Sequence, residues 1–320
     1  MYIPHKPDSF LTGDDPFLPT VPIDHDSGSV IEQLTFTPRH EGFIGIPHGG
    51  LAMGLCLDAW RRAGEPLYPV LARFKFGGSG LGIGDSATFE VEHGLDEAGR
   101  FVVAKITRNG DKTPYLRAEI RHMEQSNRSM NIDGPPGRDF RELPYYRNCF
   151  VCGHHRTEPG LQRRFRLHEF NEETLISSAW GFDRDDADRT EFFRFGKDEL
   201  HPAVITSIFD ENTAWAGFML TRSAGLSVRL DLTLHRPVSR RERLLFVGRP
   251  LGVRGNPRAP RFFVAEGTVL SMADPESPET VAYGRGEWII VDQYTRQIRE
   301  NLLPEHDWQW IFGEDRSDPV

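Results

Sequence analysis

The sequence predicts an α+β protein built from two similar halves, each with one helix followed by four antiparallel strands. Three observations support this fold class. The chain has 320 residues, whereas a single compact domain usually stops growing near ~250 to 300 residues. The helix-then-strands pattern occurs twice, with a period near half the chain. A segment rich in Gly and Pro, with few apolar residues, separates the two occurrences.

The first half is predicted to span residues 1–124, including an N-terminal arm of about twenty residues that is rich in Pro, Asp and Gly and lies on the surface. Residues 30–38 alternate like a strand, and a Gly-rich turn then leads into a helix over 51–63, which Gly64 ends. The four strand-like runs that follow are separated by turn residues. They cover residues 70–76, 86–93, 100–108 and 114–122.

A linker over 125–147, which contains the sequence Asp-Gly-Pro-Pro-Gly at 133–137, leads to a second half over 148–292. Strands are predicted at 161–170 and 174–182, then a polar loop at 183–190, then an apolar helix over 203–221. Four further strands complete the half, at 226–235, 243–248, 261–271 and 281–291. The tail, residues 293–320, carries Trp308, Trp310 and Phe312 and is expected to pack back on the body.

Composition and charge exclude several classes of function. Lys and Arg total 38 against 47 Asp and Glu, giving a formal net charge of -9, which is the wrong sign for a protein that coats nucleic acid. Three cysteines cannot form a disulfide framework and suit a reducing cytoplasm. No apolar run resembles a signal peptide or a membrane span. We therefore expect a cytoplasmic protein with neither nucleic acid nor membrane as partner.

Each predicted helix begins with a histidine, in His48-Gly49-Gly50 and in His201-Pro202-Ala203. The strings GFIGIPHGGLAMGLCLDAW and FGKDELHPAVITSIFDENTAW resemble the helix entry of hotdog-fold acyl-CoA thioesterases of the phenylacetyl-CoA-thioesterase-like group. In that group a carboxylate follows nine residues after the histidine, as Asp210 does in the second half.

Two other stretches are similar to members of the same group. They are Cys149-Phe150-Val151-Cys152-Gly153 with Pro159-Gly160-Leu161, and Gly225-Leu226-Ser227-Val228. The resemblance implies a double hotdog, in which two central helices are each wrapped by a curved antiparallel sheet. It implies hydrolysis of an acyl-CoA or a related thioester, with coenzyme A as part of the substrate and no other cofactor. A homo-oligomer, namely a homodimer of double-hotdog chains, is compatible with this interpretation.

Helix geometry requires the two catalytic groups to come from different helices. Nine residues of helix rise about 13 Å, so one helix cannot bring both its N-terminal amide and its own Asp to one thioester carbon. Pro202 has no N–H to offer, and Leu57 occupies the acid position of the first helix, with Asp58 one step on. Gly49 with Asp210 and Ser227 is therefore the one complete set.

The predicted roles follow from that set. The Gly49 N–H, at the positive end of its helix, would hold the developing oxyanion. Asp210 would either attack the thioester carbonyl or activate water, Ser227 would orient the water or the carboxylate, and His48 would fix the turn. The residues expected to contact substrate are Gly50, His201 and Thr213. No metal site is predicted.

Other interpretations of the same residues stay open. Two neighbouring glycines can simply permit close packing of a helix, and a Ser at the start of a strand is more often structural. Pro202, Leu57 and Gly42 all remove groups that chemistry would use, which favours a non-catalytic acyl- or CoA-binding protein. A hotdog dehydratase or hydratase is a further alternative, although the Asp/His pair such enzymes need on a loop is not recognisable.

Two clusters of potential ligands have a structural explanation as well as a functional one. Cys149 and Cys152 with His154 and His155 resemble zinc ligands, but no second Cys pair completes such a site, and we predict a buried lead-in to a strand instead. A run of arginines could bind the phosphates of coenzyme A or could be solvated charges of strand edges. Its members are Arg236, Arg240, Arg241, Arg243, Arg249, Arg254, Arg258 and Arg261.

Overall fold

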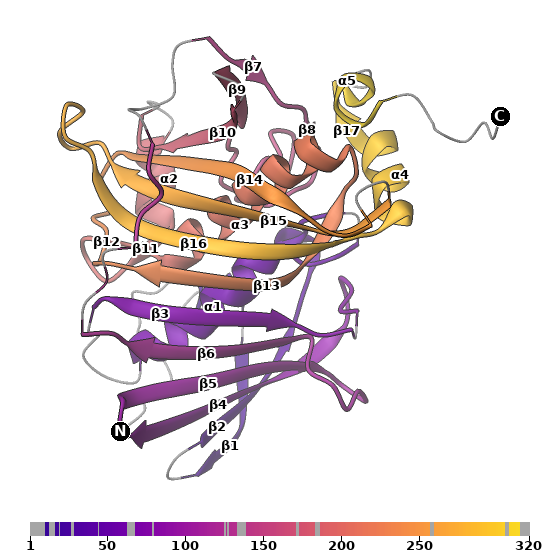
Figure 1. The fold of residues 1–320 in the computed structure, drawn as a ribbon. Helices are drawn as coiled ribbons and strands as arrows, with labels where there is room; N and C mark the ends of the chain where they lie inside the picture. Colours follow the sequence, from indigo (N-terminus) through magenta and orange to yellow (C-terminus); the bar gives the residue numbers. More distant parts are fainter. Residues whose placement is uncertain are drawn as a thin grey trace.

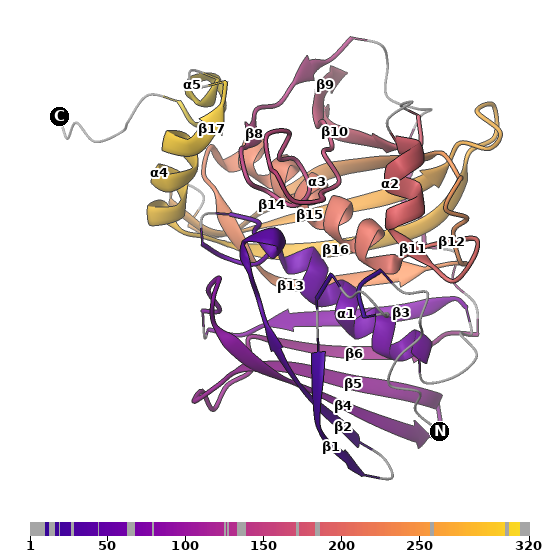
Figure 2. The same ribbon diagram turned by 180° about the vertical axis from the view of Figure 1, so that it is seen from behind.

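The computed structural model has two layers, an antiparallel sheet and the helices packed against it (Figures 1 and 2). It describes residues 10–12, 17–18, 20–26, 29–43, 45–62, 68–78, 80–124, 126, 128–132, 139–170, 173–182, 186–256, 259–304 and 307–313. Helices α1 (Gly49–Arg62) and α3 (Pro202–Thr221) lie side by side on one face of the sheet. None of the helices in these ranges is long and apolar enough to cross a membrane.

The first half contributes six strands, in the sheet order β1-β2-β4-β5-β6-β3. They are β1 (Thr20–Asp26), β2 (Ser29–Thr35), β3 (Val70–Phe76), β4 (Ser86–Asp96), β5 (Gly99–Arg108) and β6 (Leu116–His122), and the short helix η1 (Pro38–His40) follows β2. Alternate residues of β4 and β5 are buried, as the period of a half-buried strand requires. That buried face packs against α1 and forms one end of the core.

The second half continues the same sheet in the order β13-β16-β15-β14-β10-β9-β7. Its strands are β7 (Arg141–Glu142), β9 (Arg166–Phe170), β10 (Glu173–Trp180), β13 (Gly225–Leu234), β14 (Leu244–Asn256), β15 (Ala259–Ser271) and β16 (Glu279–Ile290). The halves meet where β3 and β13 pair antiparallel, with Ala72 opposite Leu232. Each of these two strands is the first long strand after the helix of its half, so the joint is symmetric.

Both predicted helices and the strands that follow them are confirmed, and four details differ. The N-terminal arm, predicted to lie on the surface, is buried at residues 10–12 and 17–18, and residues 20–26, which follow it, form β1 and pair with β2. The predicted strand at 161–170 starts only at Arg166. The predicted loop at 183–190 includes the start of helix α2 (Asp186–Phe192), since Asp186 and Asp188 favour a helix N-terminus. The strand predicted to end at 248 continues to Asn256 as β14.

Short elements occupy the linker and the tail. The predicted linker turn at 133–137 lies outside the described residues, but β8 (Tyr145–Tyr146) pairs with β17 (Leu302–Leu303) of the tail. Helices α4 (Asp292–Asn301) and α5 (Trp308–Phe312) complete the tail. Ile311 and Phe312 are buried, which confirms that the tail packs on the body. The two-stranded ribbon of β11 (Arg194–Phe195) and β12 (Glu199–Leu200) precedes α3.

Small residues allow α1 and α3 to approach closely. A β-carbon placed on Gly50 would lie 2.2 Å from Ser207 Cα, and one placed on Gly54 would lie 2.3 Å from Ala203 Cβ. The Thr206 hydroxyl donates to the Gly50 carbonyl at 2.7 Å. These contacts run in opposite directions along the two helices, so the helices are antiparallel.

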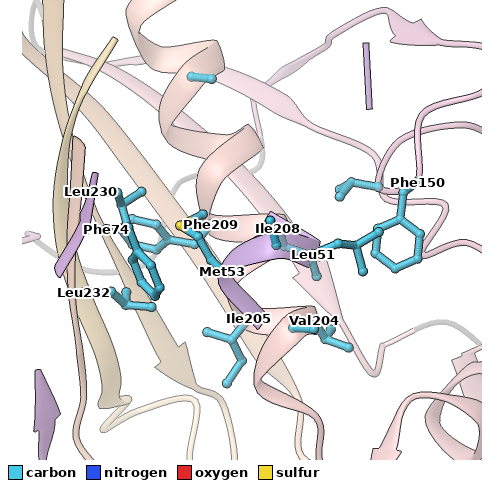
Figure 3. Close-up of a cluster of buried hydrophobic side chains, with 14 of the residues drawn as sticks. Leu51, Met53, Phe74, Phe150, Val204, Ile205, Ile208, Phe209, Leu230 and Leu232 are labelled. Atoms are coloured by element: carbon cyan, nitrogen blue, oxygen red, sulfur yellow. The ribbon is translucent and has the colours of Figure 1, made fainter. Parts of the chain in front are cut away.

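The core lies between this helix pair and the central strands. Figure 3 shows side chains of both helices meeting those of β3 and β13. They include Met53, Phe209, Phe74, Leu230 and Leu232, all buried. α3 is buried along its whole length from Pro202 to Met219, so any polar group on it needs a partner.

Candidate active site

A cavity of about 790 Å³ opens where the start of α1, the middle of α3 and the start of β13 come together. Both halves of the chain supply its wall. The polar and charged groups include His48, Asp85, Arg108, Cys149, Asp210, Glu211 and Ser227, and the aromatic rings are Phe43, Phe76, Tyr115, Phe262, Trp288 and Tyr294. Gly49 and the Gly-rich stretch after β3 form part of the rim.

Gly49, Asp210 and Ser227 meet in this cavity although they come from three different elements. A β-carbon placed on Gly49 would lie 3.1 Å from Asp210 Oδ2 and 3.3 Å from Phe76 Cζ. The Ser227 hydroxyl donates to Asp210 Oδ1 at 2.8 Å. Within the described part of the chain the Gly49 N–H donates no hydrogen bond. The set that the sequence predicts as complete is therefore brought together in space.

Burial sets the proton affinity of Asp210. It is 8% exposed, and burial raises its pKa, while the hydrogen bond from the Ser227 hydroxyl opposes that rise. A buried carboxylate with one fixed hydrogen bond and one oxygen beside a free amide can accept a proton from water or substrate. Tyr115, whose ring packs edge-on against Phe76 at 5.6 Å, lines the same cavity.

A second buried group lies next to Asp210. His48 Nδ1 accepts from the Gly50 amide at 3.0 Å, and His48 Nε2 lies 3.4 Å from Glu211 Oε2. The Cys149 thiol donates to the same Oε2 at 3.1 Å. Burial raises the pKa of Glu211 to about 8. A protonated carboxyl keeps an acceptor oxygen, so these donors retain a partner in either form of Glu211.

His48, Cys149 and Glu211 place one ligand atom each within 4.8 Å of one another, but the group does not fit a metal ion. A histidine that binds metal through Nε2 as a neutral ring must carry its proton on Nδ1. Here Nδ1 accepts the Gly50 N–H, so the proton belongs on Nε2. The lone pair that a metal would need is absent in this arrangement.

The corresponding position at the other end of the helix pair is filled. His201 Nδ1 accepts from the Ala203 amide at 3.0 Å, and His201 Nε2 lies 3.1 Å from Asp58 Oδ1. The ring of Phe10 packs edge-on against His201 at 4.7 Å, and the Thr12 hydroxyl donates to Asp58 Oδ2 at 2.6 Å. Pro202, at the start of α3, has no N–H to donate, and Phe10 occupies the space beside His201.

Solved structures with this arrangement of sheet and helices identify the fold. A putative thioesterase II from Thermobifida fusca superposes with a TM-score of 0.57 at 13% identity, covering 84% of this chain and 96% of that chain. An acyl-CoA thioesterase II, TesB2, from Mycobacterium marinum gives 0.51 at 12% identity, with 85% and 94% covered. The chain has a hotdog fold.

The hotdog fold does not by itself decide the chemistry. An isomerase-inactive variant of GphF DH1 also superposes, with a TM-score of 0.51 at 14% identity and with 85% of this chain and 95% of that chain covered. No protein-family model matches the sequence, and no curated protein does. Function in this hotdog chain has to be argued from the site.

The three residues expected to contact substrate lie elsewhere. Gly50 is pressed against Ser207 of α3, and His201 is fully buried beside Asp58. The Thr213 hydroxyl donates to the Phe209 carbonyl, one turn back in its own helix, at 2.7 Å. None of the three belongs to the described residues that line the cavity, because each is taken up by contacts within the helix pair.

Sequence reasoning missed Glu211, although one signal was available. An acid follows ten residues after each helix-opening histidine, Asp58 after His48 and Glu211 after His201. Each histidine pairs with the acid of the other helix. That repeated spacing, unlike the nine-residue spacing of Asp210, occurs in both halves of the chain.

Gly42, where the resemblance places a polar side chain, has a steric explanation. A β-carbon there would lie 2.9 Å from His48 Cα, so the loop before α1 is too close to the histidine for a side chain. The neighbouring Glu41 turns to its own loop, where its carboxylate accepts from the Gly45 amide at 2.8 Å. The loop therefore shapes the turn that presents Gly49.

The cysteine pair leads into β9, as predicted. Cys149 and Cys152 are buried, and Cys152 Sγ accepts from the Tyr146 amide at 3.4 Å. His154 and His155 pack on the Tyr145 ring.

Most arginines of the second half are paired with acids or rings. Arg236 binds Glu242 and Glu279, Arg249 binds Glu266, Arg240 binds Glu191 and Arg254 binds Glu287. Arg243 lies over Phe182 and Arg261 over Phe262. Arg258 lies outside the described residues. These pairings favour the strand-edge explanation over a phosphate site.

Proposed function

We propose that this chain is a double hotdog that hydrolyses thioesters, acyl-CoA or a related thioester, at one active site shared by its two halves. The halves correspond to residues 1–124 and 148–292, joined by 125–147 and followed by the tail 293–320. The observation that carries the proposal is the meeting of Gly49 with Asp210 and Ser227 in one cavity. At the opposite end of the helix pair, Pro202 has no N–H and Leu57 occupies the position of the acid.

The reaction follows from that geometry. The thioester carbonyl oxygen accepts the Gly49 N–H, which the helix N-terminus makes a strong donor. Asp210 Oδ2 takes a proton from a water molecule as the water oxygen attacks the carbonyl carbon. The oxyanion of the tetrahedral intermediate keeps its hydrogen bond from the Gly49 N–H. Collapse breaks the carbon–sulfur bond, and the proton held by Asp210 passes to the departing thiolate. Ser227 holds the other carboxylate oxygen throughout.

Two chemical roles are open to Asp210, since its carboxylate either activates water or attacks the carbonyl itself. We favour activation of water, which needs no covalent intermediate on a carboxylate that Ser227 already holds by one oxygen. A single turnover in ¹⁸O-labelled water tests for the second role. Label in Asp210 would show that the carboxylate attacks and that water then opens the anhydride at the Asp210 carbon, whereas activation of water puts the label only in the product acid.

The acyl group would occupy the aromatic part of the cavity. Phe76, Tyr115, Phe262, Trp288 and Tyr294 line it, and a ligand pocket of this size and apolar character suits a hydrophobic group. Coenzyme A as the carrier is supported by the resemblance of the helix-opening strings and by the name of the Mycobacterium marinum structure.

The test is turnover of a panel of acyl-CoAs by the wild type and by Asp210→Asn. We expect the wild type to release free thiol, and the variant to lose about 10²- to 10⁴-fold in kcat, since it can neither accept the proton nor attack. Thermal stability measured in parallel shows that the variant is folded. Ligand-induced thermal shifts without turnover by the wild type would establish a binding protein instead and would overturn the proposal.

A further inference from the structure

Two histidine–acid pairs join α1 and α3, one at each end of the contact between the helices. At the cavity end His48 of α1's opening turn reaches Glu211 of α3. At the closed end His201 reaches Asp58 of α1. In both pairs the ring's Nδ1 accepts the amide two residues further along its own chain, at 3.0 Å. The device is therefore duplicated, while the Gly49–Asp210–Ser227 set occurs once.

This geometry fixes where the proton of each ring lies. A neutral imidazole has one donor and one acceptor nitrogen. Because His48 Nδ1 accepts the Gly50 N–H, Nε2 must carry the proton and point it at Glu211 Oε2. A proton on Nδ1 would face another N–H group and would break the hydrogen bond that closes the turn. Glu211 Oε2 on α3 accepts the Nε2 proton and so stabilises the tautomer that holds the Gly50 amide.

The residue inside this turn is Gly49. His48 and Gly50 flank it in the chain, the His48 ring holds the Gly50 amide, and Thr206 of α3 holds the Gly50 carbonyl at 2.7 Å. The Gly49 N–H therefore points in a direction set by its two neighbours, both tied to α3. A change in the His48 ring would turn this amide without altering any group in contact with the thioester.

We propose that Glu211 is a positioning residue for the oxyanion-binding amide, acting through His48; this inference rests on the thioester hydrolysis proposed above. Glu211 fixes the His48 tautomer, His48 fixes the Gly50 amide, and the Gly49 N–H is aimed as a result. The Cys149 thiol, which donates to the same Glu211 oxygen at 3.1 Å, holds the acid in place. At the closed end the Asp58–His201 pair performs the structural part of this task alone, because Pro202 has no N–H.

Three variants separate positioning from stability. Glu211→Leu removes the acceptor, Glu211→Gln keeps an amide oxygen that can accept from Nε2, and Asp58→Leu breaks the matching pair at the closed end. We expect Glu211→Leu to lower kcat by about 10- to 100-fold with KM nearly unchanged, as a small misplacement of a catalytic group does. Glu211→Gln should recover most of kcat, and Asp58→Leu should lower Tm without lowering kcat of the folded enzyme. If Asp58→Leu does not fold, Asp58→Asn serves as the control in its place.

A spectroscopic readout tests the same inference without turnover. In ¹⁵N-histidine spectra at pH 7, His48, assigned through its loss in His48→Gln, should be neutral with its proton on Nε2, and Glu211→Leu should change that state. A protonated ring or an Nδ1–H tautomer in the wild type would overturn the inference. An unchanged kcat in Glu211→Leu would also overturn it, as would an equal fall in kcat in Asp58→Leu. A wild type without thioesterase activity would refute the proposed function but not the link between Glu211 and His48. An unaltered His48 tautomer in Glu211→Leu would refute that link.

Discussion

The hydroxyl of Ser227 controls how readily Asp210 gives up its proton. It donates to Oδ1 at 2.8 Å, and such a bond favours the ionised carboxylate. Burial raises the pKa of Asp210, and the Ser227 hydroxyl opposes the rise. The pH at which the enzyme gains activity should therefore depend on a residue that itself transfers no proton.

Ser227→Ala should move the acidic limb of the pH profile of kcat/KM to higher pH. Asp210 acts as a base only when ionised, so activity rises as pH passes its pKa, and loss of the hydrogen bond raises that pKa. A hydrogen bond to a charged group contributes about 1.5 to 3 kcal/mol, which corresponds to roughly 1 to 2 pH units. Thr221→Val, which removes a hydroxyl bonded at 2.9 Å to the Gly217 carbonyl, is the control. An unmoved limb in Ser227→Ala would refute the assignment.

The helix pair is the element that brings the site together. Gly54 lets α1 approach α3 so closely that a β-carbon would meet Ala203 Cβ at 2.3 Å. The close approach brings the start of α1 beside the middle of α3, where Asp210 lies. Packing at Gly54 thus supports the position of a site that Gly54 itself does not contact.

Gly54→Ala should destabilise the protein. Alanine is the better helix former by roughly 0.5 to 1 kcal/mol, but overpacking of a core contact costs about 1 to 3 kcal/mol, and here backbone atoms of α3 must move. We therefore expect a net loss in the free energy of unfolding, measured in urea. Gly78→Ala is the matched control, because its β-carbon would meet no atom within 4 Å. Equal stabilities of the two variants would contradict this account of the helix contact.

A buried ion pair fastens α2 to the segment before β9. Arg163 donates to both carboxylate oxygens of Asp186, at 2.5 and 3.1 Å, and the Gly181 amide donates to Oδ2 at 2.9 Å. Burial alone would raise the pKa of Asp186, but the Arg163 guanidinium holds it below its usual value. The pair therefore stabilises the fold above the unfolded-state pKa of Asp186, and this contribution is lost as pH falls through the lower folded-state pKa.

Asp186→Asn should cost about 3 to 5 kcal/mol in the free energy of unfolding at pH 7, because it leaves the Arg163 charge buried without its counter-charge. The difference from wild type should shrink as the pH is lowered through the folded-state pKa of Asp186. Urea titrations at several pH values measure it. A difference that is small at neutral pH, or that grows in acid, would show that the pair has another role.

Over the whole molecule, the sequence predicts the repeated helix-and-strand order because apolar periodicity is local. The helix starting at Gly49 and the strands of the second half follow from such patterns. Structural features that depend on contacts between residues distant in sequence leave no such local pattern. Pairing of residues 20–26 with β2, the link from Glu211 to His48, and the filling of the closed end by Phe10 and Thr12 all join parts of the chain far apart in sequence.

The site was predictable in its central part and not in its surroundings. Gly49 and Asp210 are found from the spacing that the resemblance to hotdog thioesterases supplies, and Pro202 and Leu57 remove the alternatives. Cavity residues such as Tyr115, which immediately precedes β6, follow no distinguishing sequence pattern. Their place in the cavity is set only when the sheet is folded. In the function that we propose, two similar halves make one site.

Kinetics of three variants test that central claim most directly: Gly49→Pro, Gly49→Ala and Pro202→Ala. Alanine at 49 adds a β-carbon beside Asp210 but keeps the N–H, and proline adds a similar group and removes the N–H at a helix position that tolerates it. We predict that kcat of Gly49→Pro falls about 10²- to 10³-fold below that of Gly49→Ala, while Pro202→Ala keeps wild-type kcat. Equal kcat for the two Gly49 variants, or a loss on changing Pro202, would contradict a single site built from both halves.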